Sequence, residues 1–228
     1  MLPPLHLPRP YARVYEPAED SFLLLDTLSS PSETAFLSQH FSLSPTTTTT
    51  ITTTLLSPTP LIAEIGPGSG VVLAFLTAHS QTLFSRRDIL TLGIDVNRFA
   101  CAATRETVRK AVAEDAAESG DGSGFALGVA QGDLTSPLRG GSVDVLVFNP
   151  PYVPTPDVPV VDRDVGSGVG VEGGKKTTFE EDSNLLALSY AGGRDGMEIT
   201  ERLIGELPGV LTGRQGWEKL EIVRIWRE

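Results

Sequence analysis

Short apolar runs along the chain alternate with amphipathic stretches of helical period. The apolar runs predict strands over residues 61–65, 89–95, 125–130 and 143–148. A helical face formed by Val72, Phe75 and Leu76 follows the first run, and a longer helical stretch, residues 98–117, follows the second. This alternation predicts an α/β fold with a doubly wound, mostly parallel sheet and right-handed crossovers.

Both ends of this pattern predict further elements. A first helix is expected to open near Pro17, because Glu19 and Asp20 form an acidic start before an apolar run that reaches Leu28. Towards the other end, the pattern predicts a helix over residues 198–207 and a last strand over residues 221–226.

Residues 1–228 are interpreted as a single domain, interrupted by two segments of biased composition. Residues 42–60 are rich in Thr, Ser and Pro, which is typical of a loop or a disordered insertion, with an edge strand as the alternative. Residues 160–182 are rich in Gly and in charged residues, and they predict a flexible loop.

Composition narrows the classes of protein that remain. With 228 residues, of which 40% are hydrophobic, the chain is long enough to bury a substantial core. It has no apolar run of membrane-spanning length and no signal-peptide pattern, so we expect a soluble protein of the cytoplasm, with the nucleus as an alternative. The single cysteine, Cys101, predicts helix packing, and no Cys/His spacing predicts a metal site.

Charge argues against a protein that grips long nucleic acids. The net charge of −11 is opposite to what phosphate neutralisation requires. The adjacent basic pairs Arg86-Arg87 and Lys175-Lys176 are interpreted as solvated surface features.

Asn149-Pro150-Pro151-Tyr152 directly follows the apolar run 143–148. In an open α/β sheet, ligands bind at the carboxyl ends of the strands. The Asn149 side-chain carbonyl and the Pro150 main-chain carbonyl can both accept hydrogen bonds from one planar NH2 group, and Tyr152 can stack on a flat amide or base. A Pro-rich turn after a strand is the plainer alternative.

Three other strand ends carry groups suited to a nucleoside cofactor. Glu64-Ile65-Gly66-Pro67-Gly68-Ser69-Gly70 lacks dinucleotide glycine spacing, and Pro67 removes one backbone donor, so a cofactor without phosphate fits better. Asp95 is placed to accept hydrogen bonds from both ribose hydroxyls, and Asp133 could accept one from the adenine NH2 group while Leu134 packs on the ring. A turn cap is the alternative for each aspartate.

These segments together resemble the class I S-adenosylmethionine-dependent methyltransferases of the HemK-like protein-glutamine methyltransferase family. The resemblance is strongest to the eukaryotic branch, which modifies the glutamine of the Gly-Gly-Gln loop of the eukaryotic class 1 translation release factor. The segments that carry it are residues 14–21 (Val-Tyr-Glu-Pro-Ala-Glu-Asp-Ser), 64–70, 93–97 (Gly-Ile-Asp-Val-Asn), 132–134, the tetrad 149–152 and 191–196 (Ala-Gly-Gly-Arg-Asp-Gly).

The resemblance implies a role for each matching residue. Ser21 would reach the methionine end of S-adenosylmethionine, which Glu64 and the backbone of Gly66, Gly68 and Gly70 would line. Asp95 would hold the ribose, and Asp133 with Leu134 the adenine. Asn149, Pro150, Pro151 and Tyr152 would clamp the acceptor, with Asn149 close to the sulfonium.

The resemblance also implies a partner, a small zinc-binding activator protein that forms a heterodimer by covering an apolar sheet edge. The family has a strand, a helix and another strand where this chain passes from Leu211 to the run 221–226, so we expect a sheet that lacks about two C-terminal strands.

Three alternatives stay open at this point. The same tetrad could serve an adenine-N6 methyltransferase acting on nucleic acid. The chain could be a non-catalytic shortened form that only binds partners. An acceptor other than glutamine, such as lysine, is also compatible with the sequence.

Overall fold

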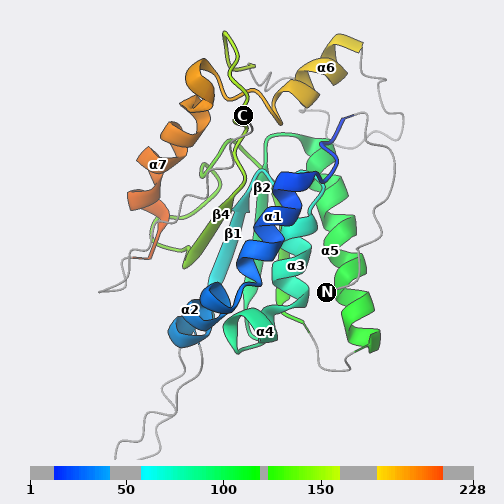
Figure 1. Ribbon diagram of the computed structural model, residues 1–228, viewed down its shortest axis with the longest axis vertical. Coiled ribbons are helices and arrows are strands. Elements are labelled where there is room, and N and C mark those ends of the chain that lie inside the picture. The colour runs from blue at the N-terminus through cyan, green and yellow to red at the C-terminus, as the bar shows by residue number, and fades with distance from the viewer. Residues whose placement is uncertain (1–12, 42–57, 119–122, 160–178, 213–228) are drawn as a thin grey trace, which may run out of the picture.

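A four-stranded parallel sheet forms the centre of the molecule (Figure 1). The computed structural model describes residues 13–41, 58–118, 123–159 and 179–212. The strands are β1 (Leu61–Ile65), β2 (Leu90–Asp95), β3 (Phe125–Gln131) and β4 (Val145–Phe148), in the order β3-β2-β1-β4. All three neighbouring pairs are parallel, which confirms the predicted α/β class. The predicted strand over 221–226 lies outside the described residues.

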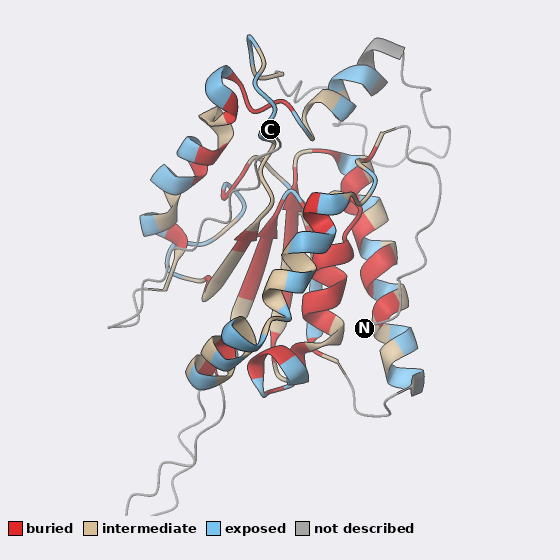
Figure 2. Ribbon diagram, in the orientation of Figure 1, coloured by how far each residue is buried: buried red, intermediate tan, exposed pale blue. Residues whose placement is uncertain are grey.

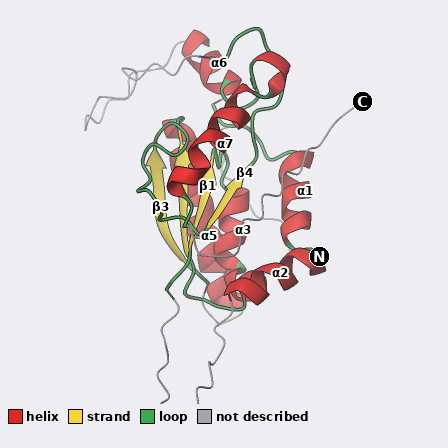
Figure 3. Cartoon of the chain, turned by 90° about the vertical axis from the view of Figure 1, so that its left-hand side faces the viewer, coloured by secondary structure: helices red, strands yellow, loops and turns green. Residues whose placement is uncertain are grey.

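Helices flank this sheet on both sides (Figure 3). They are α1 (Glu19–Leu28), α2 (Pro31–Phe41), α3 (Val71–Ala78), α4 (Ser80–Phe84), α5 (Arg98–Glu118), α6 (Phe179–Ala187) and α7 (Glu198–Val210), with a 3-10 turn η2 (Arg194–Gly196). The predicted helices correspond to α1, α3, α5 and α7. Pro17 lies before α1 rather than in its first turn, since the N-cap is Ala18.

Three helices were not predicted from the sequence. α2 and α4 pack on each other, and residues of both helices belong to one apolar core cluster, so tertiary contact compensates for a weak amphipathic pattern in the sequence. α6 begins at Phe179, so the prediction of a loop over residues 160–182 was wrong for residues 179–182. The rest of that segment, and residues 42–57 of the predicted insertion, lie outside the described residues.

Alternate residues of the strands face buried apolar clusters on opposite sides of the sheet. Ile62 and Val147 pack under α2, α3 and α4, where Phe75 and Phe84 are almost fully buried. On the opposite face, Ile65 packs with Leu203 of α7. This period of two is the expected result of side chains alternating across a pleated sheet, and it explains why β1 and β2 are mainly buried in Figure 2.

Strand order creates a switch point between β1 and β4. The chain leaves β1 towards β2 and β3 on one side, and then returns to pair β4 on the other side of β1. Connections diverge at such a point, which leaves a crevice at the carboxyl ends of the strands. The strand ends predicted to carry the site therefore meet in one place.

Arg86 is buried, contrary to the prediction from the sequence. Arg86 is 3% exposed, and its guanidinium pairs with Asp88 while donating a hydrogen bond to the Phe41 carbonyl at the end of α2 (3.2 Å). The prediction of a solvated Arg86 was therefore wrong, because a paired guanidinium can be buried.

Among the described helices, none is both long enough and apolar enough to cross a membrane.

Candidate active site

A cavity of about 1140 Å³ opens at the carboxyl ends of the strands. It is lined by nearly all the residues predicted for the site: Ser21, Glu64, Gly66, Gly68, Asp95, Asp133, Leu134, Asn149, Pro150, Pro151 and Tyr152. Gly70 is the exception, because its backbone lies against α5 instead. The topology thus brings together residues that are up to 131 positions apart in the sequence.

The N–H groups of the three glycines in the glycine loop all donate to acceptors within the protein. The N–H of Gly66 donates to the Ile94 carbonyl (2.7 Å), and that of Gly70 donates to the Pro67 carbonyl (2.8 Å). The N–H of Gly68 donates to a carboxylate oxygen of Asp95 (3.1 Å). A phosphate-binding loop directs such donors at its ligand, so this loop is not built as a phosphate cradle.

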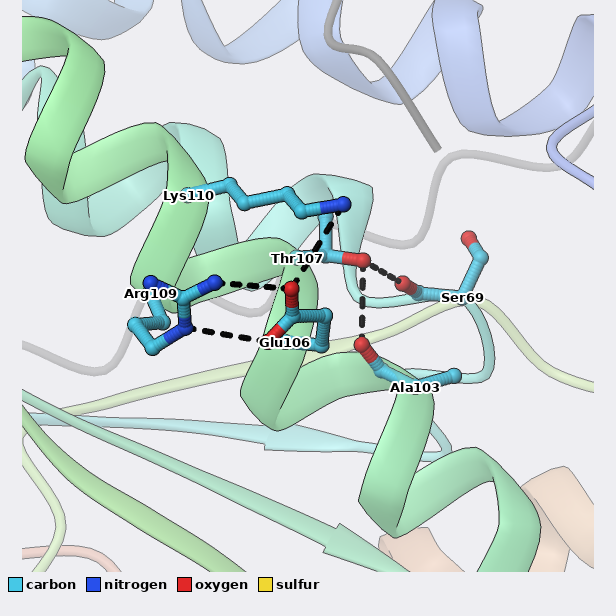
Figure 4. A network of polar contacts seen from close by, with 6 residues as sticks. All are labelled: Ser69, Ala103, Glu106, Thr107, Arg109 and Lys110. Carbon is cyan, nitrogen blue, oxygen red and sulfur yellow. Dashed lines mark hydrogen bonds and ion pairs between the residues drawn. The ribbon is translucent and has the colours of Figure 1, made fainter. Parts of the chain in front are cut away.

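Helix α5 holds the glycine loop in place. Thr104 donates a hydrogen bond to the Gly68 carbonyl (3.0 Å), and Thr107 donates one to the Ser69 carbonyl (2.8 Å), the second of which is drawn in Figure 4. Gly70 has a φ of +83°, and a Cβ there would lie 2.6 Å from the Cα of Thr104. Glycine is required at this position by both backbone conformation and space, and its role is packing rather than ligand contact.

Two buried carboxyl groups face the cavity from neighbouring strands. Glu64 is 3% exposed, and its Oε2 has no hydrogen-bond partner among the described residues. Burial, and then the charge of Asp95, raise the pKa of Glu64 to about 8. Burial also raises the pKa of Asp95 to about 6, although the N–H groups of Asn97 and Gly68 oppose that shift. A cationic ligand would reverse the cost of ionising both groups.

The loop after β3 is tied to α7. Asp133 accepts a hydrogen bond from Arg202 (2.8 Å) in a half-exposed ion pair, and Thr135 pairs with Glu206 one turn further along α7. Leu134 has a φ of +46° and buries its side chain against Ile65, Ile94 and Leu203. The sequence predicted Asp133 and Leu134 but missed Arg202 and Glu206, which only the fold brings to this loop.

Asn149 begins the tetrad at the end of β4, and its side chain contacts α1. Its Nδ2 donates a hydrogen bond to Oδ2 of Asp20 (3.2 Å). The other oxygen of Asp20 accepts a hydrogen bond from the Ser21 N–H (2.8 Å), and the Asp20 side chain is buried. From the sequence, Asp20 was assigned only to the motif 14–21 and to the acidic start of a helix. Its contact with residue 149 could not be predicted from local pattern.

The segment 191–196 supports the backbone of the tetrad. Val153 and Ala191 form a parallel bridge, in which Val153 donates to the Tyr190 carbonyl and Gly192 donates to the Val153 carbonyl (both 2.9 Å). A Cβ on Gly192 would lie 2.5 Å from the Pro151 carbonyl oxygen. The glycine there allows two chain segments to touch, which fixes the course of residues 151–153. Tyr152 itself is 45% exposed at the mouth of the cavity.

The N-terminal segment closes the wall beside Asp95. Asn97 is buried and donates a hydrogen bond to the Arg13 carbonyl (2.6 Å), while the Arg13 guanidinium lies 4.6 Å from the Phe99 ring centre. The cavity is therefore lined by the buried carboxyl groups of Glu64 and Asp95 and, at the end of β4, by Asn149 and Pro150. Such a site suits a cationic nucleoside beside an acceptor that carries a planar nitrogen.

The chain is similar in sequence to known methyltransferases. It is 30% identical over 205 residues to the "eRF1 methyltransferase catalytic subunit mtq2" of Schizosaccharomyces pombe, covering 87% of this chain and 68% of that protein. It is 32% identical over 206 residues to "Methyltransferase HEMK2" of Homo sapiens, covering 90% and 69%. A putative protein N5-glutamine methyltransferase of Methanocaldococcus jannaschii is 25% identical over 202 residues, covering 88% and 68%. No protein-family model matches the chain.

Proposed function

The chain belongs to the HemK-like family of protein-glutamine methyltransferases, and on that premise we propose that it methylates a release factor. The methyl donor is S-adenosylmethionine, and the acceptor is the side-chain amide nitrogen of the glutamine in the Gly-Gly-Gln loop of the eukaryotic class 1 translation release factor. The observation that supports this most is the shared cavity, in which two buried carboxyl groups and the Asn149 amide face the same space.

The residues present fit S-adenosylmethionine. When bound, this cofactor supplies a methyl group made electrophilic by a positively charged sulfur. The unpartnered Oε2 of Glu64 would accept a hydrogen bond from the ammonium of the methionine part, and Asp95 would accept from the ribose hydroxyls. A loop whose glycine donors are already used inside the protein fits a cofactor that carries no phosphate.

At the acceptor end, the protein works mainly by orientation. An amide nitrogen is a poor nucleophile, because its lone pair is delocalised into its carbonyl. The Asn149 side-chain carbonyl and the Pro150 main-chain carbonyl would each accept one N–H of the substrate amide, aim the nitrogen, and favour the positive charge that develops on it. When the new C–N bond forms, the bond between the methyl carbon and sulfur would break with its electron pair left on sulfur, and the nitrogen would then lose one proton to solvent. Tyr152 would cover the flat face of the amide.

Tritiated methyl transfer tests this function. The chain, together with its activator, is incubated with labelled S-adenosylmethionine and offered separately a release factor, the same factor with its loop glutamine changed to alanine, and adenine-containing oligonucleotides. Label on the unchanged factor alone supports the proposal. Label on the oligonucleotides would indicate an adenine-N6 methyltransferase instead. Cofactor binding without transfer to any acceptor would indicate a non-catalytic protein.

The edge of the sheet supports the further proposal of a zinc-binding activator as partner. β3 is an edge strand among the described strands, and its Phe125 and Leu127 side chains are 61% and 57% exposed. Exposed apolar residues on an unpaired edge favour association with another chain. Co-expression with the activator should raise the soluble yield of the wild type, and Leu127→Lys should abolish that gain. An equal gain with Leu127→Lys would argue against this edge as the interface.

A further inference from the structure

Asp20 and Asn149 meet across the mouth of the cavity, although 129 positions separate them in the sequence. Asp20 lies in the first turn of α1, and its carboxylate is held from behind by the Ser21 N–H. Its second oxygen accepts a hydrogen bond from the Asn149 side-chain NH2 group. Both partners line the cavity, and Asp20 is 8% exposed. The contact is therefore partly buried, and it joins the first turn of α1 to the end of β4.

The chemistry of an amide makes this contact consequential. The two ends of an asparagine side chain have nearly the same shape, but one end only donates hydrogen bonds and the other only accepts them. Rotating the amide by half a turn would present NH2 to the substrate, where two donors would face each other. An ionised carboxylate accepts but cannot donate, so it can pair with only one end of the amide.

Resting on the proposed function, we infer that Asp20 is a positioning residue that fixes which end of the Asn149 amide faces the acceptor. With its NH2 group held by Asp20, Asn149 must direct its carbonyl oxygen towards the substrate nitrogen. The flipped amide would bring its oxygen against the buried carboxylate and leave both oxygens without this donor, in a partly buried contact. Asp20 therefore acts through Asn149 and needs no contact of its own with the reacting atoms.

Exchanging the two functional groups tests this role. Asp20→Asn, Asn149→Asp and the double variant form a cycle in which donor and acceptor are removed separately and then swapped. In Asn149→Asp two carboxylates face each other, whereas in the double variant the amide at position 20 can donate to the carboxylate at position 149. That carboxylate can still accept a hydrogen bond from the substrate. Asp26→Asn, which removes an exposed charge from the same helix, is the matched control.

The effect of Asp20→Asn should change sign between the two backgrounds. In the wild type, we expect it to lower kcat by about 10-fold with cofactor affinity within about twofold, because the loss of one hydrogen bond to a charged group loosens the amide. In the Asn149→Asp background, the same substitution should raise kcat by about 10-fold or more and raise the melting temperature. Asp26→Asn should leave kcat, cofactor affinity and melting temperature unchanged.

An equal effect of Asp20→Asn in both backgrounds would overturn the inference, since a merely structural residue does not sense the group at position 149. Absence of methyl transfer by the wild type would instead count against the proposed function. In that case the melting temperatures of the wild type, the two single variants and the double variant still show whether residues 20 and 149 interact. Two facing carboxylates in Asn149→Asp should lower the melting temperature, and the added Asp20→Asn substitution should raise it again. No coupling in those temperatures would overturn the inference as well.

Discussion

The two ends of the cavity are built in different ways. The cofactor end, formed by Glu64, residues 66–70, Asp95 and Asp133, comes from consecutive strand ends, and its glycine loop and Asp95 are held mainly by contacts with each other and with the neighbouring helix α5. Asp133 is the part of this end that is tied to a remote segment, through Arg202 of α7. The acceptor end, formed by residues 149–152, is held entirely by segments outside its own strand, namely Asp20 and residues 191–196. The first end is therefore mainly a local product of the βαβ units, whereas the second depends on how remote parts of the chain assemble. Substitutions at the two ends should therefore have separable effects.

Removal of the tetrad's side-chain acceptor should give the largest effect and separate the two ends most clearly. Asn149→Ala should lower kcat by about 10²- to 10³-fold, because an oriented polar group at the reacting atom is lost. Cofactor affinity, measured by calorimetry, should change little. Wild-type-like turnover would show that Asn149 does not orient the acceptor, and a matching loss of cofactor affinity would show that the two ends are not separate.

A glycine at each end provides a matched pair of probes. Gly192→Ala places a Cβ against the Pro151 carbonyl and should lower kcat by about 10²-fold through displacement of the tetrad. Gly70→Ala places one against Thr104 and should weaken cofactor binding instead. Gly205→Ala, which meets nothing within 4 Å on α7, is the control and should stabilise the protein by about 1 kcal/mol. Steady-state kinetics and calorimetry on all three variants would show whether Gly192→Ala also weakens cofactor binding, which would contradict the separation of the two ends.

Glu64→Gln should weaken cofactor binding by about 10- to 100-fold, because a charge-assisted hydrogen bond to the cofactor is lost. The same substitution should change the stability of the cofactor-free protein. A carboxyl with a pKa of about 8 when folded, against 4.5 ordinarily, makes the folded state bind the extra proton between those values. Its contribution to the free energy of unfolding therefore falls by about 1.4 kcal/mol per pH unit as the pH rises through that range.

Chemical denaturation at several pH values measures this contribution as the difference between wild type and Glu64→Gln. Asp95 titrates in both proteins, so its effect largely cancels in the difference. Since a cationic cofactor favours the ionised carboxylate, its binding near pH 7 should also release protons, which calorimetry in buffers of different ionisation enthalpy detects. Identical pH profiles for the two proteins would refute a raised pKa for Glu64.

The smallest effect is expected at the exposed rim of the acceptor end. Tyr152→Ala should lower kcat/KM by about 10-fold if the ring covers the substrate amide, and Tyr152→Phe by less than about threefold, since the ring is kept. Steady-state kinetics with the release factor distinguish the two variants. Equal losses would assign the role to the hydroxyl instead of the ring.

The same difference between the two ends explains what the sequence could predict. β1, β2 and the cavity-lining residues Glu64, Asp95 and Asp133 follow from local apolar runs and from the polar residues in or after them. Asn149 was predicted for the same reason. Asp20 as its partner, and Arg202 beside Asp133, were missed, because those contacts join segments more than 65 positions apart. Burial of Arg86 was missed because it depends on packing against the end of α2, where Phe41 is 45 positions away in the sequence.

The bridge between Val153 and Ala191 has a consequence for how such a protein can evolve. Because the acceptor end is held by short segments outside the strands that form the cofactor end, mutations in those segments can alter the methylated substrate while the donor site stays intact. New acceptors can then arise by small steps from a protein that never loses its methyl donor.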